Sequence, residues 1–216
     1  MHSWDRNLKQ SGIAEPTEEE LEDIAFSSVK SLPILFKEEL DFDIEDMEKL
    51  VEDRKSKFNE DQKEVYDTIM RFVESKAAAA VFIDARGGTG KIFVLNAILT
   101  AVRALEGGSI AFAVIATGNA TNLLHLGRTL HSRFKVPLNI NKESFCNIIA
   151  NSTLAKLICE TKIIVWDEAP MNHKFQLEAL DRTLRDVTGK DKVFGGKILL
   201  LSGDFRQCLP VIPYSS

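Results

Sequence analysis

Short, fully apolar runs alternate along the chain with longer amphipathic stretches. Apolar runs that show no polar alternation are typical of strands buried on both faces of a sheet. The predicted strands cover residues 77–84, 109–117, 162–168 and 197–204, and the predicted helices cover 60–75, 91–106, 152–160 and 173–187. Strands that alternate with helices predict an α/β fold, in which a parallel sheet is covered by helices on both faces.

The ends of several helices also carry sequence signals. Asn59 is an expected N-cap for the helix that follows, and Val65, Ile69 and Phe72 fall on one face of that helix. Gly107–Gly108 is expected to stop the helix that starts at Lys91. The stretch 173–187 is amphipathic through four apolar residues, namely Leu177, Leu180, Leu184 and Val187.

Charge divides the chain into two parts. Residues 14–62 hold 17 acids against 6 bases, whereas residues 63–216 hold 19 bases against 14 acids. Before residue 57 the apolar pattern has no firm period, so one or two helices are expected in an acidic, solvated extension or linker. We therefore divide the chain into an N-terminal extension, 1–57, and an α/β domain, 58–216. The mild excess of bases in the domain permits a polyanionic partner but is weak evidence by itself.

Composition excludes several classes of protein. There is no apolar run of about 18 residues, so no membrane span is expected. The first ten residues, MHSWDRNLKQ, lack the apolar core of a secretion signal. Three cysteines without a C-x-x-C pair argue against a disulfide framework or a zinc site and fit a reducing compartment. The expected location is intracellular and nuclear.

A glycine-rich turn follows the first predicted strand. Gly87–Gly88–Thr89–Gly90–Lys91 stands between a strand and a helix, where backbone N–H groups, the helix N-terminus and a lysine bind phosphate. The alternative is an ordinary glycine-rich turn with an incidental lysine. The phosphate-loop pattern G-x-x-x-x-G-K-[ST] is incomplete, because Ala85 replaces its first glycine and Ile92 replaces its hydroxyl residue.

Two further strands end in polar residues, at the edge where ligands bind in open α/β sheets. Asp167–Glu168 follows the third strand, and such a pair holds magnesium and polarises the attacking water in nucleotide-hydrolysing enzymes. Gln207, after the fourth strand, carries an amide able to contact a γ-phosphate and a water. A helix-capping acid pair and an ordinary polar turn are the alternatives. Together, the three strand ends favour the core of an NTPase motor.

The motifs GGTGK, IIVWDEAPMNHK, EALDRTLRDV and LSGDFRQCLPVIP resemble those of the PIF-type family of ATP-dependent 5′-to-3′ DNA helicases, related to the helicase region of Helitron transposons. The resemblance runs from about Phe58 to Pro213. It implies a RecA-like P-loop NTPase domain that uses ATP and Mg²⁺ and binds single-stranded DNA. It also implies family roles in DNA repair, DNA recombination and telomere maintenance.

The resemblance assigns roles to particular residues. FNEDQ resembles the adenine-reading motif, which makes Gln62 the base contact, and Lys91 grips the β- and γ-phosphates. Asp167 serves magnesium, Glu168 activates water and Gln207 senses the γ-phosphate. The loop residues implied at the nucleotide are Gly87, Gly88, Thr89, Gly90, Lys91 and Ile92. The segment ATGNATNLLHLGRTLHSRFKVP resembles the single-strand-contacting segment of the family and includes Thr117, Gly118, Arg128, Thr129, His131 and Arg133.

Part of the single-strand segment also has a direct interpretation. GRTLHSRFK is basic, contains no acid and interleaves Arg128 and Arg133 with His131 and Phe134. Basic groups follow phosphates and aromatic faces stack on bases, which favours nucleic acid. The alternative is a surface loop whose Phe134 belongs to the core, and for Phe134 alone we favour that alternative.

Departures from the family pattern leave the activity open. The family has G-[PY]-G-G-T-G-K-T where this chain has ARGGTGKI, so Ile92 offers no hydroxyl to magnesium. The chain stops soon after GDFRQCLPV, and the second RecA-like domain, which supplies arginine fingers, is missing from it; this suggests a fragment or a transposon relic. Two alternatives to a helicase domain remain: a nucleotide- or DNA-binding pseudoenzyme without turnover and, less favoured, a small-molecule P-loop kinase.

Overall fold

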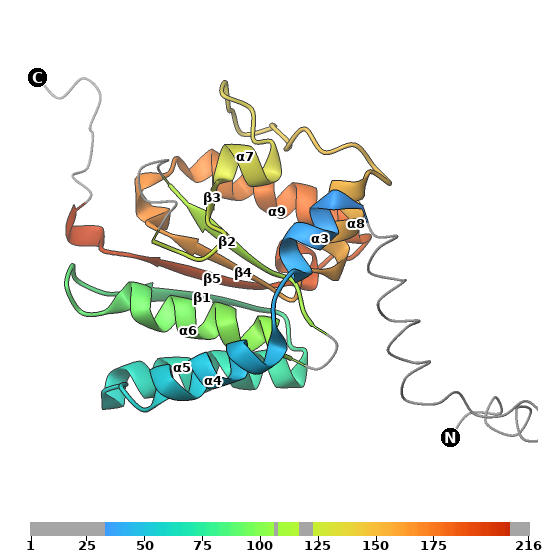
Figure 1. Cartoon of the computed structure of the whole chain (residues 1–216). Helices are drawn as coiled ribbons and strands as arrows, with labels where there is room; N and C mark the ends of the chain where they lie inside the picture. The colour runs from blue at the N-terminus through green and yellow to red at the C-terminus, as the bar shows by residue number, and fades with distance from the viewer. Residues whose placement is uncertain (1–32, 106–107, 117–122, 208–216) are drawn as a thin grey trace, which may run out of the picture.

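The computed structural model describes residues 33–105, 108–116 and 123–207. Five parallel strands form one sheet in the order β1-β5-β4-β2-β3 (Figure 1). The strands are β1 (Ala79–Asp84), β2 (Ala111–Ile115), β3 (Arg128–Thr129), β4 (Ile163–Asp167) and β5 (Ile198–Gly203). The predicted α/β class with a parallel sheet is confirmed, and the four predicted strands are β1, β2, β4 and β5.

Helices cover both faces of this sheet (Figure 1). One face carries α4 (Ile44–Lys55), α5 (Glu60–Ser75) and α6 (Lys91–Arg103), and the other carries α3 (Ile34–Leu40), α7 (Leu130–Phe134), α8 (Thr153–Glu160) and α9 (Lys174–Thr188). None of the helices in the described ranges is long and apolar enough to cross a membrane.

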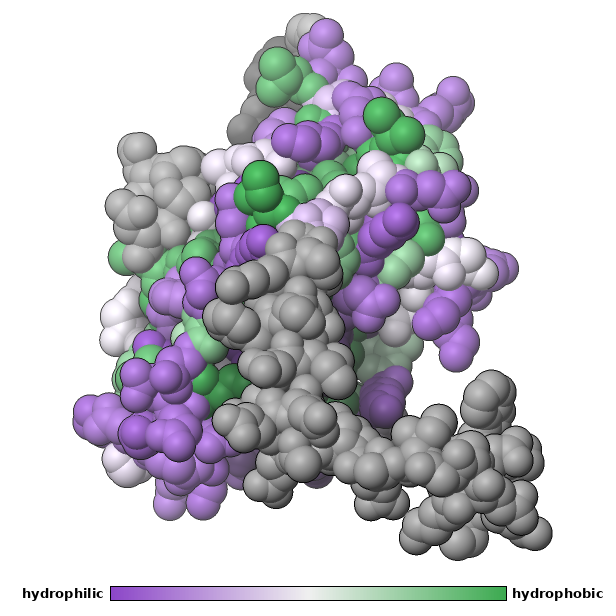
Figure 2. All heavy atoms as spheres, turned by 45° about the vertical axis from the view of Figure 1, so that its right-hand side comes forward, coloured by the Kyte–Doolittle hydropathy of each residue, from purple (hydrophilic) through white to green (hydrophobic). Residues whose placement is uncertain are grey.

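The central strands explain why their sequence runs are apolar throughout. All residues of β2 and β4 are buried, and successive side chains alternate between the two faces. In β4, Ile163 and Val165 join the core beneath α6, whereas Ile164 and Trp166 join the core beneath α9. On the face shown in Figure 2, exposed apolar side chains stand singly among hydrophilic ones, which is ordinary for a protein surface.

Most helix ends lie where the sequence predicts them. Asn59 caps α5 in a reciprocal capping box with Gln62, and Ser152 caps α8 by accepting from the Ala155 N–H. α6 ends at Arg103 rather than at residue 106, because the next turn closes through the Gly108 N–H to the Leu105 carbonyl, with Gly108 in the left-handed region. The short β3 and α7 have no clear pattern in the sequence and were not predicted.

The described part of the acidic segment packs on the domain. The described residues 33–57 contain two helices, α3 and α4, and these helices do not form a solvated linker. α4 lies against α6, where the Arg54 guanidinium donates to the Asn96 carbonyl at 3.0 Å and to Thr100 Oγ1 at 2.6 Å. α3 lies on the opposite face, with Leu35, Phe36 and Leu40 against the core there. The boundary between residues 57 and 58 stays a prediction.

Candidate functional site

Three strand ends meet at one edge of the sheet. β1, β5 and β4 are parallel neighbours, so the loops that follow them lie together. These loops contain the GGTGK turn, the Asp167–Glu168 pair and the GDFRQ stretch. The sequence motifs are therefore brought to one place, as the strand order of an α/β sheet requires for a shared ligand.

Lys91 is the centre of this edge. Its Nζ lies 2.9 Å from Asp167 Oδ1 and 2.6 Å from Glu168 Oε1, and its side chain is 9% exposed. Burial alone would lower the pKa of Lys91, but hydrogen bonds and charge attraction from the two carboxylates raise that pKa above its ordinary value. Lys91 is therefore a fixed cation, and both carboxylates are within its reach.

Asp167 has a second partner that the sequence did not single out. The Ser202 hydroxyl, from β5, donates to Asp167 Oδ1 at 2.7 Å, and Ser202 is fully buried. The signal in the sequence was slight, since Ser202 directly precedes the Gly-Asp of GDFRQ. The bond holds the Asp167 carboxylate at the tip of β4 in one orientation.

The loop before Lys91 uses two of its glycines for backbone conformation. Gly88 and Gly90 have φ of +81° and +80°, which favours glycine. An added Cβ at Gly90 would also lie 2.6 Å from Gln62 Nε2, so the Gln62 side chain would have to move. Ala85 does not have a positive φ, so replacing the first glycine of the pattern causes no left-handed strain.

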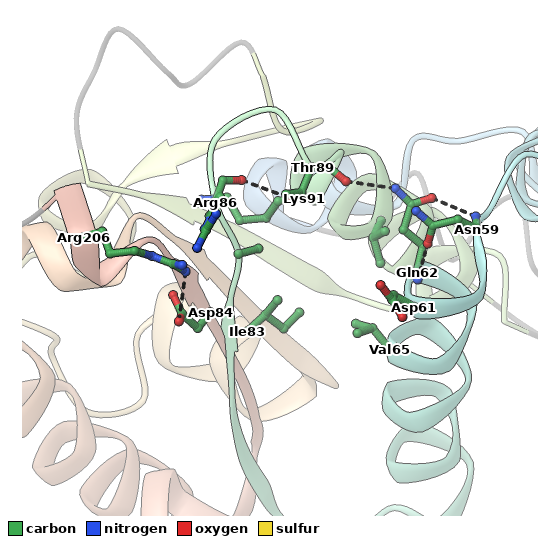
Figure 3. Close-up of a pocket in the computed structure, with 12 residues that line it drawn as sticks. Asn59, Asp61, Gln62, Val65, Ile83, Asp84, Arg86, Thr89, Lys91 and Arg206 are labelled. Atoms are coloured by element: carbon green, nitrogen blue, oxygen red, sulfur yellow. Dashed lines mark hydrogen bonds and ion pairs between the residues drawn. The ribbon is translucent and has the colours of Figure 1, made fainter.

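A cavity of about 490 Å³ opens beside this loop (Figure 3). Gln62 stands on its rim with two functions: its Oε1 completes the cap of α5, and its Nε2 donates to the Thr89 carbonyl at 3.1 Å. The cavity is lined by Asn59, Asp61, Gln62, Val65, Ile83, Asp84, Ala85, Arg86, Thr89, Lys91, Val94 and Arg206. The predicted base-contacting residue and the predicted phosphate-contacting lysine thus line one space of a size suited to a small ligand.

The GDFRQ stretch fits closely against the other two motifs. A Cβ at Gly203 would lie 2.5 Å from Pro170 Cδ, so only glycine allows β5 to approach the DEAPM turn this closely. Gln207 Nε2 donates to Asp204 Oδ2 at 3.2 Å and would lie 3.5 Å from a Cβ at Gly87. The predicted sensor amide therefore lies beside the phosphate loop.

Asp204 is the partner that orients this stretch. Burial opposes ionisation of Asp204, but hydrogen bonds from Arg206 and Gln207 prevail and lower its pKa below the ordinary value. Arg206 also reaches Asp84 Oδ2, at 3.2 Å, and thereby links the end of β5 to the end of β1. No local sequence pattern predicts this pair, because 122 residues separate its members.

The oxygen donors at this edge suit a magnesium ion. They are one fewer than a complete phosphate loop provides, because the hydroxyl residue of the pattern is replaced by Ile92. Asp167 and Glu168 present carboxylate oxygens, which Mg²⁺ prefers. Ile92 offers none, and its half-buried side chain packs against the core beneath α6. If such an ion bound here, Asp167 would hold it, and the side chain of Ile92 would contribute no oxygen donor.

The segment with the resemblance to a single-strand contact is only partly accessible. Thr117 and Gly118 lie outside the described residues. The Thr129 hydroxyl accepts from the Ser132 N–H and caps α7. His131 is half-buried near Gln176. Arg128 pairs with Glu38 of α3 at 2.7 Å, and its side chain is 38% exposed.

Arg133 is buried rather than presented at the surface. Its Nη1 lies 2.5 Å from Glu39 Oε1, its guanidinium lies 4.3 Å from the centre of the Phe112 ring, and its side chain is 3% exposed. Burial lowers the pKa of Arg133, which attraction to Glu39 partly offsets. The DNA contact predicted for Arg133 therefore requires that α3 be displaced. Phe134 is fully buried against Phe112, which confirms the core alternative for that residue.

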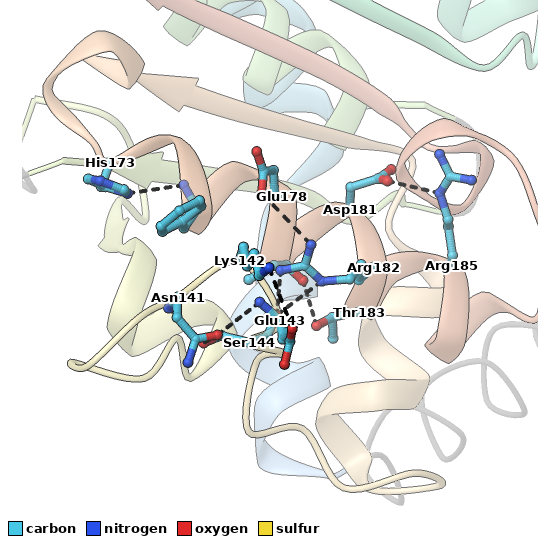
Figure 4. Close-up of polar contacts among 12 residues, drawn as sticks. Asn141, Lys142, Glu143, Ser144, His173, Glu178, Asp181, Arg182, Thr183 and Arg185 are labelled. Atoms are coloured by element: carbon cyan, nitrogen blue, oxygen red, sulfur yellow. Dashed lines mark hydrogen bonds and ion pairs between the residues drawn. The ribbon is translucent and has the colours of Figure 1, made fainter.

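Ser144 and Cys146, in the segment between α7 and α8, are fixed to α9 (Figure 4). The Arg182 guanidinium donates to the Ser144 carbonyl at 2.7 and 3.1 Å, and the Cys146 N–H donates to Thr183 Oγ1 at 2.9 Å. Arg103, a further buried arginine, supports the residues before β3 by donating to the Ala111 and His125 carbonyls. Burial lowers the pKa of Arg103 to about 10. Hydrogen bonds therefore anchor the chain both before β3, through Arg103, and after α7, through α9.

Fold and site together define a RecA-like P-loop NTPase domain. Residues 57–216 match the model of the PIF1-like helicase family, and the chain belongs to this family.

Similar proteins support this family assignment. The chain is 30% identical over 139 residues to an ATP-dependent DNA helicase Pif1 of Psychrobacter sp. (strain PRwf-1), covering 63% of this chain and 20% of that protein. It is also 30% identical over 139 residues to the ATP-dependent DNA helicase RRM3 of Saccharomyces cerevisiae, covering 63% and 19% of the two chains. The chain thus spans about a fifth of the length of these relatives.

Solved structures show the same fold. Pif1 helicase from Bacteroides, in complex with ADP-AlF3 and ssDNA, superposes with a TM-score of 0.56 at 26% identity, covering 70% of this chain and 34% of that one. Pif1 helicase from Candida albicans has a TM-score of 0.55 at 23% identity, covering 72% and 34%, and supports the fold alone.

Proposed function

We propose that this chain binds ATP with Mg²⁺ at the edge of β1, β5 and β4 and acts as the first motor domain of an ATP-dependent 5′-to-3′ DNA helicase. The observation that carries the proposal is the position of Lys91, which lies within hydrogen-bond distance of Asp167 and Glu168 beside an open cavity. A nucleotide phosphate that enters the cavity exchanges with the carboxylates as the partner of Lys91. The helicase names of the relatives and the nucleotide and ssDNA in the Bacteroides complex support this assignment.

Each residue at this proposed nucleotide site has a separate role. Lys91 and the loop amides hold phosphates, and Gln62 reads the base from the cavity rim. Magnesium, when bound, neutralises phosphate charge. Asp167 holds that ion, Ser202 keeps the Asp167 carboxylate oriented, Glu168 accepts a proton from the attacking water, and Gln207 senses the γ-phosphate beside Gly87. Roles in DNA repair, recombination and telomere maintenance, and a nuclear location, belong to the same proposal.

Single-stranded DNA is the proposed second ligand. Arg128 and His131 are the accessible candidates among the described residues of the predicted strand segment. Thr129 and Arg133 serve the domain itself in this conformation, through a helix cap and a buried ion pair.

A second function is favoured by one residue. Ile92 removes the hydroxyl that a phosphate loop offers to magnesium, so the chain also fits a nucleotide-binding pseudoenzyme in which binding persists and turnover does not. ATP hydrolysis that depends on Mg²⁺ and is stimulated by single-stranded DNA supports the helicase motor. Nucleotide binding without any hydrolysis supports the pseudoenzyme.

The test of the site is a titration of a fluorescent ATP analogue against the wild-type chain and Lys91→Ala. We expect the wild type to bind and Lys91→Ala to bind at least about tenfold more weakly, because the lost contact is charge-assisted. Lys63→Ala, which removes one lysine from the exposed surface of α5, is the matched control and should bind like the wild type. Equal binding by Lys91→Ala and the wild type, or no binding by either, would refute the phosphate-loop assignment.

A further inference from the structure

Three residues distinguish the phosphate loop of this chain from the family pattern: Ala85, which causes no left-handed strain, and Arg86 and Ile92, which lie on either side of Lys91 in sequence. Ile92 replaces a hydroxyl residue, and Arg86 occupies the position where the pattern has proline or tyrosine. The first change removes an oxygen donor for magnesium. The second adds a cation to the loop itself, and Arg86 lines the same cavity as Lys91 (Figure 3).

Among the described residues, Arg86 has no acidic partner, unlike the other cations of this cavity. Lys91 is paired with Asp167 and Glu168, and Arg206 is paired with Asp84 and Asp204. Within the described part of the chain, the Arg86 guanidinium makes neither an ion pair nor a hydrogen bond, and the residue is exposed. A ligand in the cavity would therefore meet a guanidinium whose donors are not engaged by described protein groups.

The backbone holds Arg86 at the base of the loop. Its carbonyl accepts from the Thr89 N–H at 3.4 Å and from Thr89 Oγ1 at 2.9 Å. This turn closes the loop over the residues that precede Lys91, and Thr89 is itself tied to Gln62 through its carbonyl. Arg86 thus starts from a fixed backbone position between the phosphate loop and the cavity.

The chemistry of a guanidinium suits the phosphates of a nucleotide. Its planar fork of N–H donors matches two phosphate oxygens at once, and it remains charged at any physiological pH. A polyphosphate carries several negative charges, which magnesium ordinarily neutralises in such sites. A loop that has lost a magnesium donor and gained a guanidinium has shifted part of that neutralisation from the ion to the protein.

We propose that Arg86 binds the phosphates of the nucleotide directly and makes nucleotide binding by this chain largely independent of magnesium. The inference rests on the proposed nucleotide site and specifies which of its residues compensates for Ile92. Arg86 is a binding residue here, and no step of hydrolysis is assigned to it.

The experiment titrates a fluorescent ATP analogue against the 216-residue chain twice, once with Mg²⁺ and once with EDTA. The variants are Arg86→Ala and Arg86→Lys. Arg71→Ala is the matched control, because Arg71 is an exposed arginine on α5 whose guanidinium bonds to Asp67 and Thr68 of the same helix. Lys91→Ala reports on the proposed site as a whole, and the thermal midpoint of each variant shows that it is folded.

We expect the wild-type dissociation constant to change less than about threefold between Mg²⁺ and EDTA. Arg86→Ala should weaken binding about tenfold in EDTA, which corresponds to one charge-assisted hydrogen-bonding group, and should weaken it less in Mg²⁺. Arg86→Lys should retain part of the affinity, since it keeps the charge but not the fork. Arg71→Ala should match the wild type in both conditions.

Two results would overturn this inference alone, and a third would overturn the proposed nucleotide site as well. Wild-type binding that disappears in EDTA would show that the ion is still required. Arg86→Ala that matches Arg71→Ala would show that Arg86 does not contact the nucleotide. In both cases Lys91→Ala would still bind more weakly than the wild type in Mg²⁺. No binding by the wild type in either condition would refute the proposed nucleotide site, and the role of Arg86 with it.

Discussion

Lys91 and Arg133 are both buried cations paired with glutamate, but their surroundings differ. Lys91 is 9% exposed and lies at the edge of a cavity of about 490 Å³. The side chain of Arg133 is 3% exposed, and that of its partner Glu39, on α3, is 2% exposed. Apolar residues of α3 pack against the core on this face. A ligand can exchange with the carboxylates at Lys91, whereas no ligand reaches Arg133 while α3 is in place.

The difference shows why basic residues in a sequence motif are not equivalent as candidates for anion binding. Taking charges out of water is costly in both places, and paired partners offset this cost. At Lys91 the partners are strand-end acids that an incoming phosphate can replace. At Arg133 the partner comes from the acidic N-terminal segment, which provides a carboxylate where the sequence motif suggested DNA phosphate.

The largest expected effect concerns ATP turnover at the site around Lys91. We expect the 216-residue chain to hydrolyse ATP very slowly, and Ile92→Thr to increase turnover only modestly while it strengthens magnesium-dependent nucleotide binding. An arginine finger is worth about 10³–10⁵ in rate in related NTPases. Of the two described arginines that line the cavity, Arg206 is already paired with Asp84 and Asp204, and Arg86 is proposed to bind the nucleotide without a role in hydrolysis. Phosphate release should be measured for the wild type and Ile92→Thr.

Ile92→Thr combined with Glu168→Gln is the control for this prediction. The second change should abolish whatever activity the first restores, because it removes the proposed base. Rates of tens per second from Ile92→Thr alone would show that a finger is not limiting. Restored activity that survives Glu168→Gln would remove Glu168 from its proposed role.

A smaller effect, on stability, distinguishes the buried Glu39–Arg133 pair from the exposed Glu38–Arg128 pair. Glu39→Gln leaves Arg133 buried without a counter-charge, so it should lower the free energy of unfolding by about 3–5 kcal/mol. Glu38→Gln breaks the exposed pair with Arg128 and should cost less than about 1 kcal/mol. Urea unfolding of both variants provides the comparison, and similar losses for the two would mean that the Glu39–Arg133 pair is not a structural centre.

The smallest effect is on single-stranded DNA. Arg128→Gln should reduce the slope of log affinity against log salt by about 0.7, the contribution of one phosphate contact on a single strand. Glu38→Gln frees Arg128 from its partner and should raise affinity a few-fold at low salt. Fluorescence anisotropy of a labelled oligonucleotide at several salt concentrations measures both. An unchanged slope in Arg128→Gln would exclude this surface as the phosphate contact.

Local pattern determined much of the architecture. The apolar runs identified four of the five described strands, and the predicted cap Asn59 located the start of α5. The placement of GGTGK, Asp167–Glu168 and Gln207 at one edge followed from the motif order together with the parallel sheet. β3 and α7 were missed because they are too short, at two and five residues, for a periodic signal.

Contacts between distant residues were decided only by the tertiary structure. Three such contacts join separate strand ends and loops, and no local pattern specifies them. They are the contacts of Ser202 with Asp167, of Arg206 with Asp84, and of Gly203 with Pro170. The same holds for Glu39, which the sequence assigned to a solvated acidic segment but which is buried on Arg133, 94 residues away. The sequence by itself determined the elements, their parallel arrangement and the chemistry carried at the strand ends, because hydrophobic period, caps and motifs act over a few residues. Which cation stands open to a ligand and which is covered depended on how α3 packs, since exposure is a property of the whole fold.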